Sequence, residues 1–283
     1  MKRNLLELAI IVASTFLAQN MKADVLVGPG GAFQPWTASV LGPKSAPTNN
    51  GVPYWNNLSG DGSTANIGWC LSGGGACAIA SPPGAINYYG TATAGAVQNM
   101  NFVSTGNPVG VTLLQQLTNQ LGTVQNSGYN VFGWYAINAN GTITSTTQLW
   151  NSKTDSLGET ATFTPGAPGT KYGLYLENIQ GGGTNVEADY FWFMNSSSDK
   201  TAGPGQNPID GLQHFALFSG GGGTYYAGID DTNFGNDDFN NMVIELVTAP
   251  EPRTLVLSGM GLVLLGFYAF RRRSHPAIAG TQV

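Results

Sequence analysis

The densest group of side chains that could do chemistry lies between residues 230 and 241. Four aspartates and several amide side chains fall within this stretch, and their oxygens are the hard donors that Ca²⁺ takes six to eight at a time. The spacing differs from that of an EF-hand loop. The sequence predicts a calcium site between a turn and the last strand, while a solvated acidic loop that caps its own turns fits equally well. The candidate ligands are Asp230, Asp231, Asn236, Asp237, Asp238 and Asn240.

The two cysteines of the chain, Cys70 and Cys77, flank a segment that contains three consecutive glycines. Such a segment is flexible enough to close a small ring, and a close pair in an exported protein is readily oxidised. We therefore expect a Cys70–Cys77 disulfide, which would contribute about 2–3 kcal/mol by the chain-entropy model. Two buried free thiols are the alternative interpretation.

Residues suited to enzymatic catalysis are scarce. His214 is the only histidine before the C-terminal apolar segment, and it lies in a strand-like run. The sequence contains no Gly-x-Ser-x-Gly elbow, zincin helix motif or phosphate-binding Gly-Lys loop. Glu187 and Asp189 could be imagined as the two carboxylates of a glycoside hydrolase, but the aromatic residues beside them are typical of a central sandwich strand. We expect that the chain is not an enzyme.

Aromatic residues suggest a second kind of site. Exposed rings beside loops rich in Asn and Asp would let a β-sandwich hold sugars, with calcium assisting. A calcium-assisted glycan-binding module is therefore the alternative to a passive structural protein. The candidate rings are Trp36, Tyr54, Trp55, Tyr88, Tyr89, Tyr225 and Tyr226.

The C-terminal residues combine a Pro-Glu-Pro triplet, an uncharged apolar run and three arginines. The prolines hold the triplet extended and keep it out of a helix. The apolar run over 255–270 would form a helix of roughly 24 Å, just short of the roughly 30 Å hydrocarbon core of a bilayer. The arginines should stay in the cytoplasm, which leaves the preceding chain outside. The residues concerned are Pro250, Glu251, Pro252, Arg271, Arg272 and Arg273.

Together these features resemble the PEP-CTERM sorting signal of exported Gram-negative proteins, over residues 249–273. In that family a membrane-embedded, cysteine transpeptidase-like enzyme, exosortase, recognises the triplet, removes the tail and passes the body to the cell surface or exopolysaccharide matrix. The resemblance implies exosortase and the Sec machinery as partners, exopolysaccharide as a further partner, and a transient stay in the inner membrane. The chain departs from the usual pattern in the ten residues that follow the arginines.

The N-terminus has the layout of a secretory signal peptide. Two basic residues precede a short apolar stretch over 5–17, and the small residue Ala23 follows. We expect a signal peptide over 1–23 that is cleaved after Ala23. A cut nearer Ala18 and a permanent N-terminal anchor are the alternatives.

Removing both signals changes the charge of the protein. Between residues 24 and 250, four lysines stand against fourteen acidic residues, which gives a net charge of −10 rather than the −5 of the whole chain, and no arginine remains. Such a body lacks the basic surface that nucleic acids need and remains a plausible partner for divalent cations. We exclude nucleic-acid binding.

The elements that must position these residues are mainly strands. Glycine is about twice as frequent in the body as its average of roughly 7%, and clusters of Gly, Pro, Asn and Ser separate short β-type runs. We expect a β-sandwich or jelly-roll-like body with one short helix, Val111 to Leu121. The expected strands are 66–71, 85–89, 129–137, 141–150, 160–164, 172–178, 189–195, 214–218, 224–229 and 241–247, with a tight hairpin at Asn140-Gly141.

The C-terminal part of the body also resembles a family. The run from Gly228 to Glu245, with its Gly-Ile-Asp-Asp turn and Asp-Asp-Phe-Asn-Asn-Met-Val strand, is similar to the end of a bacterial β-sandwich domain of unknown function that often precedes PEP-CTERM tails. The resemblance implies a fold and no activity. The expected organisation is a signal peptide over 1–23, a Gly/Pro-rich part over 24–127, a sandwich-like region over 128–248, the sorting signal over 249–273 with a transmembrane helix over 254–270, and a cytoplasmic tail over 274–283.

Overall fold

The structure, a computed structural model, describes residues 22–35, 67–71, 86–90, 99–116, 129–179, 190–194, 198, 200–201, 214–229, 239, 241–248 and 266. The chain divides into two compact units. Residues 22–249 form one unit, called the body below, and residues 1–21 together with 250–283 form the other.

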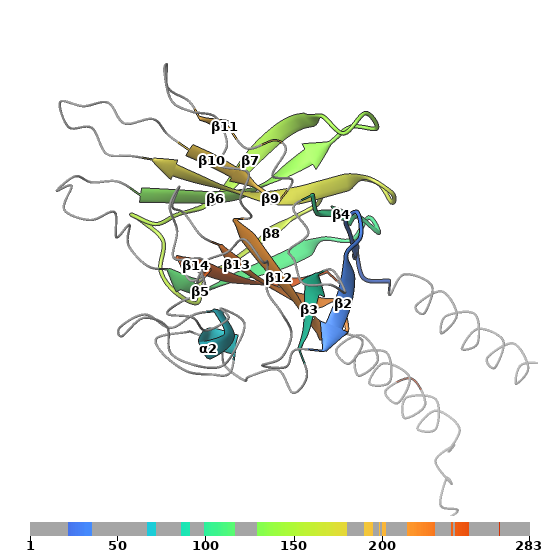
Figure 1. Ribbon diagram of the computed structural model, residues 1–283, viewed down its shortest axis with the longest axis horizontal. Coiled ribbons are helices and arrows are strands. Elements are labelled where there is room, and N and C mark those ends of the chain that lie inside the picture. Colours follow the sequence, from blue (N-terminus) through green and yellow to red (C-terminus); the bar gives the residue numbers. More distant parts are fainter. Residues whose placement is uncertain are drawn as a thin grey trace, which may run out of the picture. The chain divides into compact units, whose positions relative to one another are not determined.

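The body is built from two antiparallel sheets that lie as two layers (Figure 1). One sheet, sheet A, contains β1 (Val25–Val27), β4 (Asn101–Val103), β6 (Tyr129–Ile137), β7 (Ile143–Asn151), β9 (Lys171–Ile179), β10 (Tyr190–Phe193) and β11 (Lys200–Thr201). Sheet B contains β2 (Ala32–Pro35), β3 (Asn87–Gly90), β5 (Val109–Gln116), β8 (Thr160–Phe163), β12 (Phe215–Gly221), β13 (Thr224–Ile229) and β14 (Met242–Val247). This mainly β architecture fits a β-sandwich, as the sequence predicts.

Each sheet mixes early and late parts of the chain. In sheet A, β9 pairs with β6 along its whole length on one side and with β4 and β10 on the other. In sheet B the order is β2-β3-β12-β13-β14-β5-β8. Strands from before residue 117 therefore belong to the same two sheets as the later strands.

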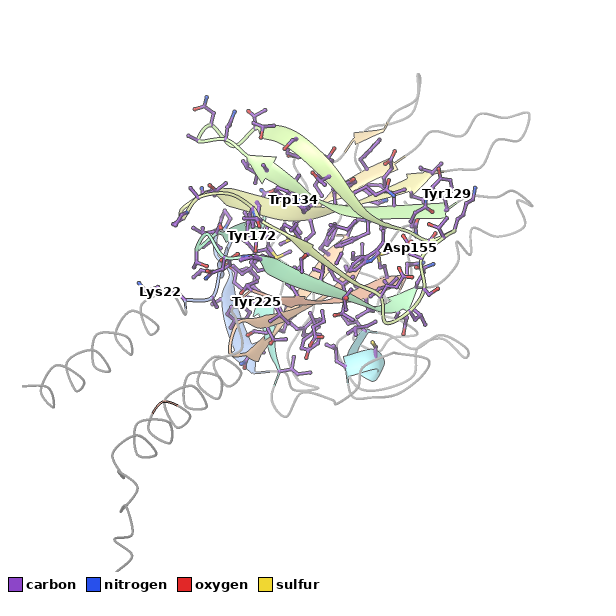
Figure 2. The ribbon with its side chains drawn as sticks, turned by 180° about the vertical axis from the view of Figure 1, so that it is seen from behind. Lys22, Tyr129, Trp134, Asp155, Tyr172 and Tyr225 are labelled. Atoms are coloured by element: carbon purple, nitrogen blue, oxygen red, sulfur yellow. The ribbon has the colours of Figure 1, made fainter. Side chains whose placement is uncertain are left out.

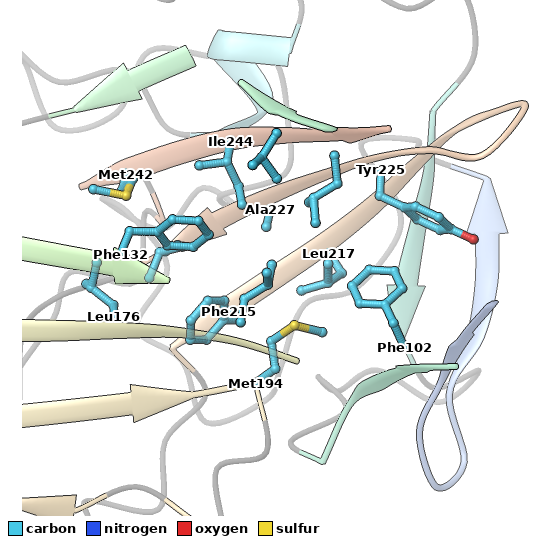
Figure 3. Close-up of a cluster of buried hydrophobic side chains, with 14 of the residues drawn as sticks. Phe102, Phe132, Leu176, Met194, Phe215, Leu217, Tyr225, Ala227, Met242 and Ile244 are labelled. Atoms are coloured by element: carbon cyan, nitrogen blue, oxygen red, sulfur yellow. The ribbon is translucent and has the colours of Figure 1, made fainter. Parts of the chain in front are cut away.

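A single cluster of buried side chains fills the space between the layers (Figure 3). Phe102, Phe132 and Leu176 enter it from sheet A, while Phe215 and Ile244 enter it from sheet B. Burial follows the two-residue period of the strands, which sends alternate side chains to this face. Removal of this apolar surface from water is the main force that holds the sheets together.

Part of the outer face of each sheet is also apolar. On sheet A, Tyr135, Ile137, Tyr175 and Phe193 form a second buried cluster. On sheet B, the short helix α2 (Ile67–Leu71) packs over a third cluster. This two-sided burial explains why β10, β12 and β13 read as continuous apolar runs rather than as alternating ones.

Most of the predicted strands are confirmed. The runs 129–137 and 224–229 coincide with β6 and β13, and seven others overlap β3, β7, β8, β9, β10, β12 and β14 with ends shifted by at most three residues. Apart from β5, the strands that the prediction lacked have four residues or fewer: β1, β2, β4 and β11.

The predicted helix over Val111 to Leu121 is wrong, because residues 109–116 form strand β5 between β14 and β8. The leucine spacing suggested a helical face, but Val111 and Leu113 point into the core between the sheets while Leu114 joins the cluster on the outer face of sheet B. A strand that is buried on both faces lacks the simple alternation that would reveal it.

The predicted strand over residues 66–71 is also wrong, since residues 67–71 form helix α2. Ile67, Cys70 and Leu71 are buried in the cluster below sheet B, and their three-to-four-residue spacing suits one face of a helix. Gly228 of β13 leaves the space that Ile67 occupies, because a Cβ atom there would overlap the Ile67 side chain.

The predicted hairpin between β6 and β7 is confirmed, with a longer turn than the dipeptide implied. Asn138 accepts a backbone hydrogen bond from Gly141 and donates one to Thr142, and only Gly141 of this turn has a positive φ, at 83°. This is the pattern of a four-residue turn that ends in a left-handed glycine.

Candidate functional site

The residues that the sequence singled out for a calcium site lie outside the described residues: Asp230, Asp231, Asn236, Asp237, Asp238 and Asn240. Their calcium role therefore stays a prediction. The strands on either side are described, and Ile229 at the end of β13 pairs with Met242 at the start of β14, so the acidic segment connects two neighbouring antiparallel strands. Among the described residues, no group of three His, Cys, Asp or Glu side chains could hold a metal ion.

The sorting residues, Pro250, Glu251, Pro252, Arg271, Arg272 and Arg273, also lie outside the described residues, as do Glu187 and Asp189. Within the described ranges, which include only Gly266 of the C-terminal apolar run, no helix is long and apolar enough to cross a membrane. The transmembrane prediction therefore stays a prediction.

Cys70, one of the two cysteines predicted to pair, is disulfide-bonded. Cys70 is fully buried at the end of α2 and takes part in a disulfide. Cys77, the other cysteine of the chain, lies outside the described residues. The expected pairing of Cys70 with Cys77 stays a prediction that the state of Cys70 favours.

Four of the proposed sugar-binding rings are part of the core. Tyr88, Tyr89, Tyr225 and Tyr226 expose 7% of their surface or less, so they cannot form a stacking platform for a glycan. The interpretation of these four as exposed rings is wrong, because both faces of sheet B are covered. Trp36, Tyr54 and Trp55 lie outside the described residues.

His214 is likewise a core residue. It exposes 3% of its surface, and its ring stacks on that of Trp192 with centroids 3.7 Å apart and planes 14° apart. This packing bridges the two sheets, and His214 lies one residue before β12, at the start of the run that the sequence predicted as a strand.

A group of polar side chains gathers at the end of the body where β5 and β9 end and β6 begins. Asn178 Nδ2 donates to Asn130 Oδ1 at 2.9 Å between two fully buried side chains. Gln116 Nε2 donates to the Ser152 carbonyl at 2.7 Å, while the Gln116 Oε1 atom is buried and makes no hydrogen bond. The register Gln116↔Met242 brings the start of β14 to the same end.

The most connected polar residue lies at the other end of the body and was missed by sequence reasoning. Asp24, which is fully buried, directly precedes β1. Its Oδ1 accepts hydrogen bonds from the Thr105 backbone N–H at 2.7 Å and from the Thr105 hydroxyl at 2.6 Å. Its Oδ2 accepts one from the Tyr172 hydroxyl at 2.7 Å, and its carbonyl accepts one from the Tyr225 hydroxyl at 2.8 Å.

Asp24 also joins the two ends of the body. Its backbone N–H donates to Thr248 Oγ1 at 3.2 Å, and the Thr248 N–H and hydroxyl both donate to the Gly223 carbonyl, at 2.9 and 3.0 Å. Thr248 is fully buried and directly follows β14. We call Asp24, Thr105, Tyr172, Tyr225 and Thr248 the terminal clamp.

The terminal clamp spans both layers of the sandwich. Thr105 follows β4 and Tyr172 belongs to β9, both strands of sheet A. Tyr225 belongs to β13 of sheet B. Figure 2 shows Tyr172 and Tyr225 on the same side of the body as Lys22, and Tyr129 and Asp155 on the opposite side. The clamp therefore fixes the relative position of the first strand, the last strand and both sheets at one end.

The buried tyrosines of the body titrate at unusually high pH. Burial raises the pKa of Tyr172, and the negative charge of Asp24 raises it further. The same two causes, in the same order, raise the pKa of Tyr225. On the outer face of sheet A, burial and then the charge of Glu177 raise the pKa of Tyr175 to about 12.

We expect these tyrosines to make the body sensitive to alkali. The pKa of Tyr175 is about 12 in the folded body and about 10 in an unfolded chain. The contribution of this difference to the free energy of unfolding is therefore fully present below about pH 10 and is lost as the pH rises to about 12. The melting temperature of the wild type should fall over that interval, and the melting temperature of the Tyr175→Phe variant should fall less steeply. A melting temperature that stays constant up to about pH 12 would contradict this expectation.

The chain matches no protein-family model, no curated protein and no solved structure among those compared.

Proposed function

We propose that this chain is the precursor of an exported protein with a structural role at the cell surface or in the extracellular, biofilm-associated matrix of a Gram-negative bacterium. Export begins with a signal peptide, and exosortase then removes the C-terminal tail at the Pro-Glu-Pro triplet. The body that remains has no catalytic function in this proposal.

The observation that carries the proposal is the position of the body's boundaries. The body spans residues 22–249, while 1–21 and 250–283 belong to the other unit. Asp24 and Thr248, the residues that close the body at its two ends, are hydrogen-bonded to each other. Both apolar segments can therefore be removed without removing a strand of either sheet, which is what a doubly processed precursor requires.

The character of the body supports a structural role over glycan binding. Four of its candidate sugar-binding rings are buried in the core, and nearly all of its large apolar side chains among the described residues serve packing between or outside the sheets. A sandwich with a packed core and a net charge of −10 over residues 24–250 suits a stable, soluble part of a hydrated matrix.

The proposal is tested by producing the whole chain in a Gram-negative host with and without an exosortase. We expect the tail to be removed and the body to reach the surface only when the exosortase is present. Replacing the triplet (Pro250→Ala, Glu251→Ala, Pro252→Ala) should leave the tail in place, whereas the control His275→Ala, beyond the arginines, should be processed normally. Retention of the tail in both hosts would overturn the proposal.

A further inference from the structure

The side chain of Asp24 is a buried carboxylate that the proposed function does not use. Its hydrogen-bond partners among the described residues are neutral: a backbone N–H and a hydroxyl from Thr105, and the hydroxyl of Tyr172. Buried charges in proteins are usually paired with an opposite charge or with a metal. The carboxylate of Asp24 thus has hydrogen bonds to neutral groups, and no described residue supplies it with a counter-charge.

The backbone nitrogen of the same residue already has a hydrogen-bond acceptor inside the body. The Asp24 N–H points to Thr248 Oγ1 at 3.2 Å, and Thr248 in turn donates to the carbonyl of Gly223. Asp24 is fully buried, whereas Ala23 is partly exposed and Lys22 is exposed. A positive charge on this nitrogen would lie about 4 Å or less from the carboxylate in the folded and the unfolded chain alike. Burial in the folded body is what would strengthen their attraction relative to the unfolded chain.

We propose that cleavage of the Ala23–Asp24 bond supplies this missing charge, so that removal of the signal peptide completes an ion pair inside the body. Hydrolysis consumes one water molecule; the carbonyl carbon of Ala23 takes the hydroxyl and leaves as a carboxylate, and the nitrogen of Asp24 becomes an ammonium. That ammonium keeps its hydrogen bond to Thr248 and neutralises the Asp24 carboxylate. The mature N-terminus is thereby held against the residue that precedes the tail.

This inference rests on the export step of the proposed function and is independent of the tail. Its consequence is that the processed body is more stable than a body in which the amino group is displaced. As the first residue, Asp24 would add to the terminal clamp a positive charge that the unprocessed chain lacks, and a signal peptidase that cuts after Ala23 is the class of enzyme that would supply it.

The test compares four exported forms of the full chain in a host without exosortase. Gly-Ser inserted between Ala23 and Asp24 moves the new amino group two residues away while the residues before the cut stay the same. Asp24→Asn removes the negative charge in each background. Intact mass identifies the first residue of each form, and thermal unfolding gives its stability.

We expect the wild type to begin at Asp24 and to melt several degrees above the form with the insertion. The difference should vanish between the two forms that carry Asp24→Asn, because no carboxylate remains to pair with the ammonium. A different first residue in the wild type, or equal melting of the two forms that retain Asp24, would overturn the inference. Failure of the proposed function would show itself separately, as a tail that exosortase does not remove.

Discussion

Replacing Asp24 with alanine is expected to destabilise the body by about 3–5 kcal/mol. The substitution deprives the Thr105 N–H, the Thr105 hydroxyl and the Tyr172 hydroxyl of their acceptor, and each buried group left without a partner costs about 1–3 kcal/mol. For a domain of this size the melting temperature should fall by roughly 10 °C. Thermal or denaturant unfolding of the exported protein measures the loss.

Two control variants test whether the loss of stability comes from the hydrogen bonds of the buried Asp24 carboxylate. Asp24→Asn keeps the shape and one acceptor oxygen, so it should cost less than Asp24→Ala. Glu159→Ala removes an exposed carboxylate and should change the stability by less than about 0.5 kcal/mol. If Asp24→Ala were as mild as Glu159→Ala, the terminal clamp would not hold the ends of the body together.

Replacing Gly133 with alanine is expected to cost about 3 kcal/mol or more. Gly133 of β6 pairs with Gln148 of β7 and with Tyr175 of β9. A Cβ atom at this position would overlap both the carbonyl oxygen of Thr147 and the ring of Tyr175. Because the Thr147 carbonyl oxygen is a backbone atom, the strands themselves must move apart to admit the Cβ atom. The loss of stability should therefore be large among overpacking substitutions.

Gly110 provides the control for Gly133. It also lies in a strand, β5, and a Cβ atom there would meet only the Val247 carbonyl oxygen at 3.9 Å, an ordinary contact. Since glycine weakens a strand relative to alanine by about 0.5–1 kcal/mol, Gly110→Ala should leave the stability unchanged or raise it slightly. Equal unfolding curves for Gly133→Ala and Gly110→Ala would contradict the packing of β6 between β7 and β9.

The glycine at position 133 illustrates what sequence reading could and could not foresee. The strand around it was predicted correctly from its aromatic and β-branched residues and from the turn that follows. The reason for the glycine lies in the partner strand, β9, where Tyr175 pairs with Gly133. Two residues further along β6, Tyr135 pairs with Gly173 in the same way. Each ring lies where the opposite side chain would be, and such reciprocity appears only once the register is known.

The error over β5 has a physical cause. The helix prediction assumes that the element buries a single face, whereas β5 has buried side chains on both faces of its sheet. Leu113 and Leu114 of β5 are buried in different clusters, so neighbouring residues are both apolar and the two-residue period is hidden. Local spacing cannot distinguish this arrangement from one face of a helix.

The terminal clamp could not be predicted for a different reason. Its hydrogen bonds join Asp24 to residues 81, 148, 201 and 224 positions away. An aspartate after a predicted signal peptide has no local signature that marks it as buried. Only the pairing of β1 with β4, and the return of β14 beside β13, brings these residues together.

The most direct test of the proposed function is the intact mass of the protein recovered from the cell surface of a host that has exosortase. We predict a single species that begins at Asp24 and lacks the apolar segment and arginines after the Pro-Glu-Pro triplet. A surface species that retains this segment, or a full-length chain that stays inside the cell, would contradict the account.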